Sequence, residues 1–448
     1  MEDSETDSVV VLGGGISGLS TAWYLKKKGV DVTLFEADTE TGGVINSECN
    51  DYSVFDFGPN TIRDKAGTVS KMIHELGLET ETLSISEASK TRYIVKDGEL
   101  KSINQNPVSL LFSDLLSLKG KKDLFLEPFR KSTQIDKDES IGDFLERRIG
   151  KEAVAYLADP FFSGIYAGDI YSMSKKKLLR TISDAEQQHG SVLKGLLKNR
   201  SKEKKPSRKP EVLSFKKGVQ QLTKLLSLVL SNHIQYERVE SLELKKSDFL
   251  IKTLQNEYTF DKVISCLPAY ELEKILNESH QDLKSKLLDI DYPPMLSTQL
   301  VFRKEDLILP EKGFGFLVPR KEQFRLLGAI WKSNIFPSQT RADYIHVNLM
   351  TGGAHDTKIS AKNIEEVELE VLKEFSQIMK TEAHPSVTSS RLCMNSIPQF
   401  KVGYAKTDKL LNEFESEYKG LYIGGNYRWG VSVTDCIDAA KELAKKII

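Results

Sequence analysis

The sequence contains few of the residues that build disulfide frameworks and metal sites. Its 448 residues include four cysteines, none paired at CxxC spacing, and seven histidines, none in an HExxH arrangement. This scarcity excludes a disulfide scaffold, indicates a reducing compartment and predicts no metal site. The formal net charge of -1 also gives no overall attraction to nucleic acid or lipid.

Charge is absent from one stretch, SVVVLGGGISGLSTAWYL at residues 8–25. A bilayer span needs about 20 apolar residues, and glycines weaken a helix that must cross lipid. The acidic residues MEDSETD that precede the stretch lack the basic n-region of a signal peptide. A phosphate-binding turn is the interpretation that the following residues support.

Within this stretch, SVVVL predicts a buried parallel strand and LSTAWYLKKKG predicts a helix. Between them lies Gly13-x-Gly15-x-x-Gly18, whose glycines allow a tight turn, a close approach to pyrophosphate and close helix–strand packing. A second predicted strand, VDVTLFE, ends at Glu36, whose carboxylate can accept hydrogen bonds from a ribose diol. Together these features favour a dinucleotide site over a simple glycine-rich turn.

Two later segments favour FAD over a nicotinamide cofactor. Gly42 and Gly43 permit a second close backbone approach, as an extended FAD molecule requires, although a simple loop would also use them. The terminal GLYIGGNYRWGVSVTDCIDAAKELAKKII predicts a strand, a turn and a helix, with Ser432 and Asp435 at capping-box spacing. The positive end of that helix would face the negative charge of a reduced flavin; alternatively, it is only a well-capped terminal helix.

Taken together, the segments resemble the flavin-dependent protoporphyrinogen oxidases of the monoamine-oxidase-like flavoprotein superfamily. The resemblance rests on VVVLGGGISGLSTAWYLKKKGVDVTLFEADTETGG, FGPNTIR, TRYIVKDGEL, PFFSGIYAGD and GGNYRWGVSVTDCIDAAK. It extends over essentially the whole chain, thinly at residues 187–210 and 271–402.

The resemblance implies FAD as cofactor and a set of residues that contact it. Val44 departs from the basic or large residue that often follows the glycine pair, and Gly-Asn-Tyr stands where many flavoproteins have Gly-Asp. The implied contacts are Gly13, Gly14, Gly15, Ile16, Ser17, Gly18, Glu36, Ala37, Gly43, Val44, Gly58, Pro59, Asn60, Thr61, Val239, Asn426, Val431, Ser432 and Val433.

The expected fold class is α/β, with a discontinuous Rossmann-like FAD-binding domain of the glutathione-reductase type, a mixed-sheet substrate domain and an inserted helical domain. We assign residues 1–90, 211–270 and 403–448 to the FAD-binding domain, and 91–106 and 271–402 to the substrate domain. Residues 107–210 form the inserted domain, where the family has its membrane-associated region; an ordinary helical lid is equally compatible. The basic run at 194–209 is either a solvated loop or a contact with anionic lipid.

The reaction that the resemblance implies is the oxidation of protoporphyrinogen IX to protoporphyrin IX in haem biosynthesis. Six electrons leave in three hydride transfers to flavin N5, and this chemistry needs no dedicated strong base, so we single out no catalytic acid or base. Arg92 matches an arginine that binds a substrate propionate, unless it is a surface residue at a strand start. Gly164 matches a position beside the reacting carbon, unless it merely ends a helix.

Three other functions stay open from the sequence. Coproporphyrinogen III oxidation follows the same mechanism, an amine or carotenoid oxidase would place Tyr427 and Trp429 in an aromatic cage, and a GDP dissociation inhibitor would use the fold without flavin. The expected partners are the porphyrinogen, oxygen or a quinone as electron acceptor, a peripheral membrane contact and a second copy in a homodimer, with no nucleic acid. The expected location is the cytoplasm, including the inner face of the membrane.

Overall fold

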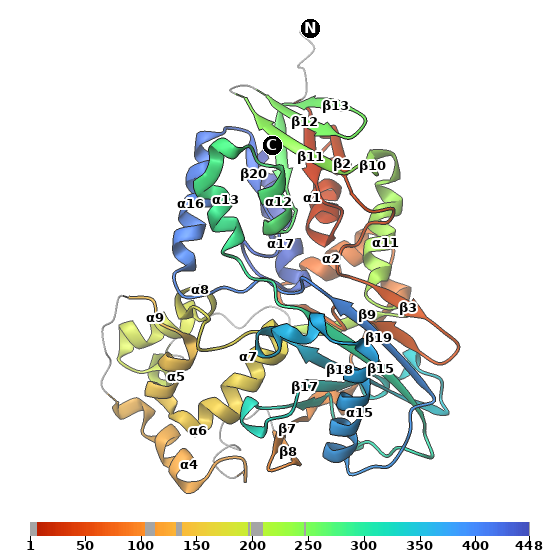
Figure 1. The fold of residues 1–448 in the computed structure, drawn as a ribbon, viewed down its shortest axis with the longest axis vertical. Coiled ribbons are helices and arrows are strands. Elements are labelled where there is room, and N and C mark those ends of the chain that lie inside the picture. The colour runs from red at the N-terminus through yellow and green to blue at the C-terminus, as the bar shows by residue number, and fades with distance from the viewer. Residues whose placement is uncertain are drawn as a thin grey trace.

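The computed structural model describes residues 7–103, 113–130, 137–195, 198, 209–245 and 248–447. Most of the basic run at 194–209, and the beginning of the inserted region, lie outside these residues. Three groups of elements are visible in Figure 1: a sheet flanked by helices at the top, a second sheet at the lower right and a group of helices at the lower left.

The upper sheet has five parallel strands in the order β10-β2-β1-β14-β20. In β1, Val9 and Val11 pack into one hydrophobic core, and Val10 and Leu12 pack into another, so both faces of the sheet are covered. The strands are β1 (Val9–Leu12), β2 (Val32–Phe35), β10 (Ile234–Gln235), β14 (Lys262–Ser265) and β20 (Leu421–Ile423).

Helices cover one face of this sheet, and helices together with a small antiparallel sheet cover the other. The first layer contains α1 (Ile16–Lys26), α11 (Gln220–Val229) and α17 (Val433–Ile447), and α2 (Thr68–Glu75) packs beside α17. The second layer contains β11 (Val239–Leu244), β12 (Phe249–Thr253), β13 (Glu257–Phe260), α12 (Ala269–Ile275), α13 (Gln281–Leu288) and α16 (Tyr404–Glu417). This two-sided α/β arrangement is the predicted Rossmann-type architecture.

The lower sheet is mixed, with seven strands in the order β19-β15-β18-β17-β16-β7-β8. Its only parallel pair among the described strands is β16 with β7, which brings residues 92–103 beside a segment more than 200 positions later. The strands are β7 (Arg92–Lys96), β8 (Glu99–Ile103), β15 (Met295–Arg303), β16 (Gly315–Leu317), β17 (Leu326–Trp331), β18 (Tyr344–Gly352) and β19 (Val387–Cys393), with α14 (Lys332–Ile335) after β17 and α15 (Ile364–Met379) packed on the sheet.

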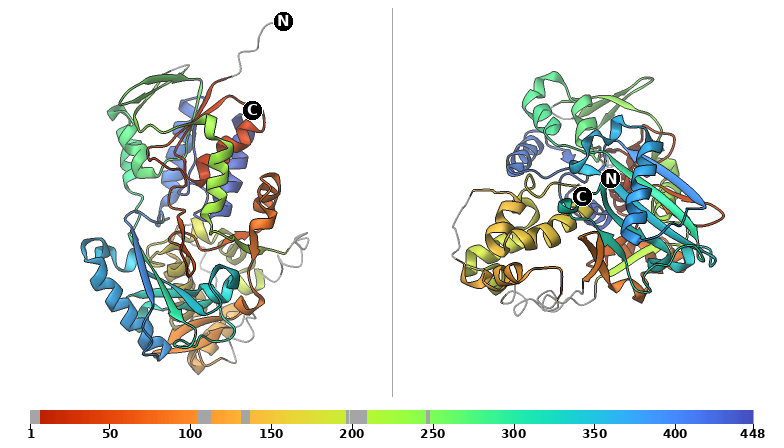
Figure 2. Two further views of the ribbon diagram at one scale, coloured as in Figure 1. Left: turned by 90° about the vertical axis from the view of Figure 1, so that its right-hand side faces the viewer. Right: turned by 60° about the horizontal axis from the view of Figure 1, so that its bottom comes forward.

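Short strands connect the two large sheets. They are β3 (Ser47–Cys49), β4 (Val54–Asp56), β5 (Ile62–Asp64), β6 (Thr82–Ser84) and β9 (Glu211–Phe215); β3 pairs with β4, and β9 pairs with both β5 and β6. Figure 2 shows the upper sheet standing above the lower sheet along the long axis of the molecule. On this arrangement we propose the same division into domains as the sequence suggested.

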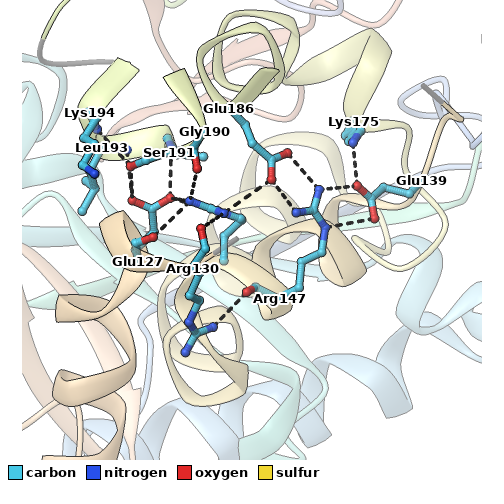
Figure 3. Close-up of polar contacts among 12 residues, drawn as sticks. Glu127, Arg130, Glu139, Arg147, Lys175, Glu186, Gly190, Ser191, Leu193 and Lys194 are labelled. Atoms are coloured by element: carbon cyan, nitrogen blue, oxygen red, sulfur yellow. Dashed lines mark hydrogen bonds and ion pairs between the residues drawn. The ribbon is translucent and has the colours of Figure 1, made fainter. Parts of the chain in front are cut away.

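The described part of the inserted region is helical. It contains α4 (Leu118–Phe125), α5 (Ile141–Ile149), α6 (Lys151–Ala153), α7 (Asp159–Tyr166), α8 (Lys175–Leu178) and α9 (Arg180–His189). Ion pairs hold this region together. Arg148 forms a buried pair with Glu127, and the half-buried Arg147 bridges Glu139 and Glu186 (Figure 3). Each charge has an opposite partner, which offsets the desolvation that burial imposes on it.

Candidate cofactor and substrate site

The first glycine turn is packed backbone to backbone against the second glycine pair. The Gly42 amide donates to the Gly14 carbonyl oxygen (2.9 Å), and Gly15 and Gly42 form a parallel bridge. A β-carbon on Gly18 would lie 1.8 Å from the Gly13 carbonyl oxygen, so only glycine lets α1 approach β1 this closely. The structure therefore brings together the two glycine segments that the sequence assigned to one cofactor.

Space for an anion lies beside Gly15. A β-carbon there would meet no protein atom within 4 Å, although its neighbours Gly14 and Gly18 have no such room. Gly15 is also the N-cap of α1, and no side chain caps this helix end. The first amides of α1, from Ile16 to Gly18, are thus free to face a pyrophosphate, and the cradle fits the diphosphate of FAD.

Glu36 lies at the carboxyl end of β2, where the ribose site is expected. Its two carboxylate oxygens accept hydrogen bonds from the amides of Gly14 and Asp38, both at 2.9 Å, which hold the side chain beside the glycine turn. The Glu36 amide donates to the Gln235 carbonyl oxygen (2.9 Å), and β11 begins at Val239 shortly after. Glu36 and the adjacent Ala37 therefore lie at the edge where β10 also ends, and the chain reaches Val239 four residues after Gln235.

The predicted capping box at the start of α17 is confirmed. The Asp435 amide donates to the Ser432 hydroxyl (3.1 Å), and the Ser432 amide donates to the Asp435 carboxylate (3.4 Å). The Thr434 hydroxyl donates to the Arg63 carbonyl oxygen (2.8 Å), which ties this helix end to β5. Burial raises the pKa of the Cys436 thiol to about 11, opposed by a hydrogen bond with Ser17, so α17 also touches the first turn of α1.

The segment at 58–61 packs on the second glycine pair. A β-carbon on Gly58 would lie 2.2 Å from the Val44 carbonyl oxygen, and Val44 itself is 54% exposed. Asn60 is buried, and its side-chain nitrogen donates to the Gly58 carbonyl oxygen (3.2 Å). Gly43, Val44 and residues Gly58 to Thr61 thus form one continuous wall.

The turn that contains Asn426 is held by two cations, and sequence reasoning identified neither. Arg428 is buried and donates from Nε to the Ile423 carbonyl oxygen (3.2 Å). Lys177, from α8 of the helical region, donates to the Arg428 carbonyl oxygen (2.7 Å) and pairs with Asp408 (2.6 Å). Arg428 lies within the quoted GGNYRWG motif, but nothing in the lysine-rich sequence around Lys177 distinguishes it from its neighbours.

Arg92 and Arg63 lie close enough for their charges to interact. Partial burial, and then the charge of Arg63, lower the pKa of the Arg92 guanidinium below its ordinary value. The Arg92 guanidinium lies 4.6 Å from the ring centre of Phe314, and both arginines remain accessible to solvent. Among the described residues no ion pair joins either guanidinium to a carboxylate, so the two arginines are suited to an anionic ligand. The sequence pointed to Arg92 alone.

Gly164 lies inside α7, two residues before its end. The prediction that it could end a helix is wrong, because Ala167 is the left-handed residue that terminates α7. A β-carbon on Gly164 would come within 2.5 Å of Leu317 Cδ2, so the glycine allows α7 to pack closely on β16. Burial, and then the charge of Asp435, raise the pKa of Tyr166, which places the end of α7 near the start of α17.

The structure therefore brings the predicted contacts into two neighbouring groups. The glycine turn, Glu36 and Ala37 lie at the edge of the parallel sheet, and Val239 follows four residues after β10 ends. Val44, the 58–61 segment and the Val431–Val433 start of α17 lie toward the lower sheet. That sheet contains Arg92, and α7 packs on it at Gly164. That these residues contact cofactor and substrate stays a prediction.

Comparison with known proteins places this geometry in a family. Residues 16–448 match the family model for flavin-containing amine oxidoreductases. The chain is 29% identical to protoporphyrinogen oxidase 2, chloroplastic/mitochondrial, of Arabidopsis thaliana over 98% of this chain and 93% of that one. It is 27% identical to coproporphyrinogen III oxidase of Bacillus subtilis (strain 168) over 97% and 96% of the two chains.

A solved structure from Exiguobacterium sp. 255-15, described as a candidate protoporphyrinogen oxidase, is similar over the whole fold. It superimposes with a TM-score of 0.84 at 22% identity and covers 99% of each chain. At this identity the match shows the fold alone.

The open space at Gly15 gives a direct test of the cradle. We expect Gly15→Ala to fold normally, because its φ of -71° suits alanine and no protein atom obstructs the new methyl group. The same methyl group would meet the pyrophosphate, so the purified variant should carry at least tenfold less flavin by its visible absorbance. Gly18→Ala is the contrasting variant, since it should lower both the flavin content and the melting temperature. A normal flavin content in Gly15→Ala would place the pyrophosphate elsewhere.

Proposed function

Since the chain belongs to the flavin-containing amine oxidoreductase family and is an FAD-dependent oxidoreductase, we propose that it oxidises protoporphyrinogen IX to protoporphyrin IX in haem biosynthesis. The observation that carries the proposal is the pair formed by Arg92 and Arg63, which has no carboxylate partner within the described residues. A porphyrinogen supplies propionate carboxylates for these guanidiniums. The relatives that bear the name protoporphyrinogen oxidase also align with nearly the whole chain.

The residues of the site bind and orient the substrate. FAD, when bound, supplies the acceptor for the three hydrides that the oxidation removes. Arg92 and Arg63 fix the propionate edge of the macrocycle through charge-assisted hydrogen bonds, and the Phe314 ring beneath Arg92 keeps its guanidinium in place. Proper orientation of the methylene bridges is the main contribution of the protein, because the reaction needs no strong base.

Coproporphyrinogen III is the second candidate substrate. It carries four propionates where protoporphyrinogen carries two, and two adjacent unpaired arginines would suit either molecule. The relative from Bacillus subtilis with 27% identity bears that name. Oxygen or a quinone as electron acceptor, and a homodimer, stay predictions.

An amine oxidase with an aromatic cage of Tyr427 and Trp429 is not supported. Tyr427 is fully buried in the core around the parallel sheet, where burial raises its pKa well above the ordinary value. Trp429 is partly exposed, but its ring faces the Arg428 guanidinium at 5.3 Å. The two rings therefore do not form a cage for a substrate amine.

Anaerobic mixing of the purified protein with each porphyrinogen tests the proposal. Protoporphyrinogen should bleach the visible flavin absorbance faster than coproporphyrinogen does. The reverse order would assign the protein to the coproporphyrinogen branch. A yellow protein that neither porphyrinogen bleaches would contradict both substrates.

Replacement of Arg92 tests the propionate contact. We expect Arg92→Ala to raise KM by about 10- to 150-fold, because a charge-assisted hydrogen bond contributes about 1.5–3 kcal/mol. Steady-state kinetics with protoporphyrinogen measures this change, with flavin content as a check on the fold. Arg341→Ala is a matched control, since Arg341 is exposed and already paired with Asp343. An unchanged KM in Arg92→Ala would remove this arginine from the site.

We further propose a peripheral membrane contact through the α4 patch, defined as Leu118, Phe125, Leu126, Phe129 and Leu193 with Lys119, Lys122 and Lys194. The apolar members protrude from the surface: Leu118 is 86%, Phe125 66% and Phe129 73% exposed. The Lys194 ammonium lies 5.7 Å from the Phe129 ring centre, so the two halves of the patch are adjacent. Exposed apolar side chains among lysines suit the surface of an anionic membrane.

Glu152 accepts hydrogen bonds from the amide and the hydroxyl of Ser117 at the start of α4, and two further acidic residues near the patch are already paired. Asp123 pairs with Arg130, and Glu127 is buried, where it accepts hydrogen bonds from Arg148, the Ser191 hydroxyl and the Val192 amide (Figure 3). Glu127 thereby fixes residues 191–193 beside α4. No helix in the described part of the chain is long and apolar enough to cross a membrane.

Vesicle binding tests the α4 patch. The double variant Phe125→Ser/Phe129→Ser should bind at least tenfold more weakly to vesicles of phosphatidylcholine and phosphatidylglycerol, because each phenylalanine that enters lipid contributes about 1.5–3 kcal/mol. Co-sedimentation measures the bound fraction. The control is Leu254→Ser, at an 85% exposed position between β12 and β13 at the opposite end of the molecule (Figure 1). Equal binding by the wild type and the double variant would contradict a contact through this patch.

A further inference from the structure

A chain of buried polar side chains runs from Ser53, before β4, through the lower sheet to the 58–61 segment. It begins at Ser53, continues through β18 and β15, and ends at Asn60, and its members are buried in the protein interior. The successive contacts are Ser53 Oγ to His346 Nδ1 (2.7 Å), His346 Nε2 to Gln299 Oε1 (2.8 Å), Gln299 Nε2 to Ser297 Oγ (2.9 Å), Ser297 Oγ to Asn348 Oδ1 (2.9 Å) and Asn348 Nδ2 to Asn60 Oδ1 (3.0 Å).

Backbone carbonyl groups determine which way the amides point. A carbonyl oxygen can only accept, so the atom that faces it must be an amide nitrogen. Gln299 Nε2 donates to the Asp56 carbonyl oxygen (3.0 Å), which leaves its Oε1 toward His346. Asn60 Nδ2 donates to the Gly58 carbonyl oxygen (3.2 Å), which leaves its Oδ1 toward Asn348.

The protonation of His346 sets the direction of hydrogen-bond donation along the whole chain. Because Gln299 Oε1 can only accept, His346 Nε2 must carry the proton. Nδ1 can then only accept, so the Ser53 hydroxyl donates to it at 2.7 Å rather than to the Gln339 carbonyl oxygen at 3.1 Å. Complete burial, and then the charge of Lys332, lower the pKa of His346 well below its ordinary value, so the ring is neutral. Every donor in the chain therefore points from Ser53 toward Asn60.

A buried ion pair anchors the middle of this chain. Lys332 Nζ lies 2.7 Å from Asp56 Oδ2, and both side chains are fully buried. Asp56 Oδ1 accepts from the Ser47 hydroxyl (2.5 Å) and the Val219 amide (3.0 Å). Asp56 is thus fixed through three donors, and with it the carbonyl group that orients Gln299.

We propose that the side-chain amide of Asn60 presents an N–H group to FAD. The chain from Ser53 to Asn348 positions this amide, because it prevents the Asn60 side-chain oxygen from turning toward the cofactor. The Oδ1 atom is occupied by Asn348, and one of the two N–H groups is occupied by Gly58. The second N–H group matches the hydroxyl and carbonyl oxygens of the ribityl chain and flavin ring. This inference rests on the proposed placing of FAD along residues 58–61.

The affinity for the adenylate end of FAD serves as an internal reference for the affinity for the whole cofactor. Asn60→Asp replaces the donor by an acceptor of the same shape, and Asn348→Leu removes the group that orients Asn60. FAD release on dilution of each holoprotein, followed by flavin fluorescence, gives the affinity for the whole cofactor. Competition by ADP in the same experiment gives the affinity for the adenylate end, which does not reach residues 58–61.

We expect both variants to bind FAD about tenfold more weakly, the equivalent of one lost hydrogen bond, with the ADP affinity unchanged within about twofold. Thr298→Val is the control. Thr298 is buried in the same strand as Ser297 and Gln299, but among the described residues its hydroxyl bonds to Ser390 alone, so both affinities should be retained.

Parallel losses of FAD and ADP affinity would overturn the inference, because they would show a general loss of structure. Unchanged FAD affinity in Asn60→Asp would also overturn the inference. If Asn348→Leu does not fold, the FAD and ADP affinities of Asn60→Asp are sufficient to test it. No porphyrinogen enters the experiment, so its outcome is independent of the proposed substrate.

Discussion

The Gly13 carbonyl oxygen occupies the place where a β-carbon on residue 18 would stand, and the cofactor half of the molecule is built around that contact. Because Gly18 has no side chain, α1 begins directly behind β1 and its uncapped amides open beside Gly15. The Gly42 amide donates to the Gly14 carbonyl oxygen, which brings Gly42 and Gly43 beside the first glycine turn. The later segments, 58–61 and the start of α17, take their positions from this pair of turns.

One buried and one half-buried lysine join this half to the rest of the protein. Lys177 reaches from the helical region to the turn that follows β20, and Lys332 reaches from the lower sheet to Asp56. Isolated charges in such places would destabilise the fold, so their exact pairing restricts how the parts can be assembled. Each contact thereby fixes the distance between a cofactor loop and a neighbouring layer.

In the helical region a buried ion pair also joins segments that are distant in the sequence. Arg148 and Glu127 form a fully buried pair, and Glu127 also receives the Val192 amide, which holds residues 191–193 beside α4 (Figure 3). Phe125 and Phe129 lie on the surface beside this attachment and outside the core of the region.

Local sequence patterns alone determined the glycine-rich turn after β1, the strands around it and the capping box of Ser432 and Asp435. These features depend on residues within a few positions of one another, so periodicity and turn chemistry suffice. Only the tertiary structure placed Arg63 beside Arg92, buried Tyr427, set Gly164 against Leu317 and oriented Asn60 through Asn348. The partners in these contacts come from segments 29 to 288 positions apart, and whether a side chain is buried, paired or free depends on which distant segment packs against it.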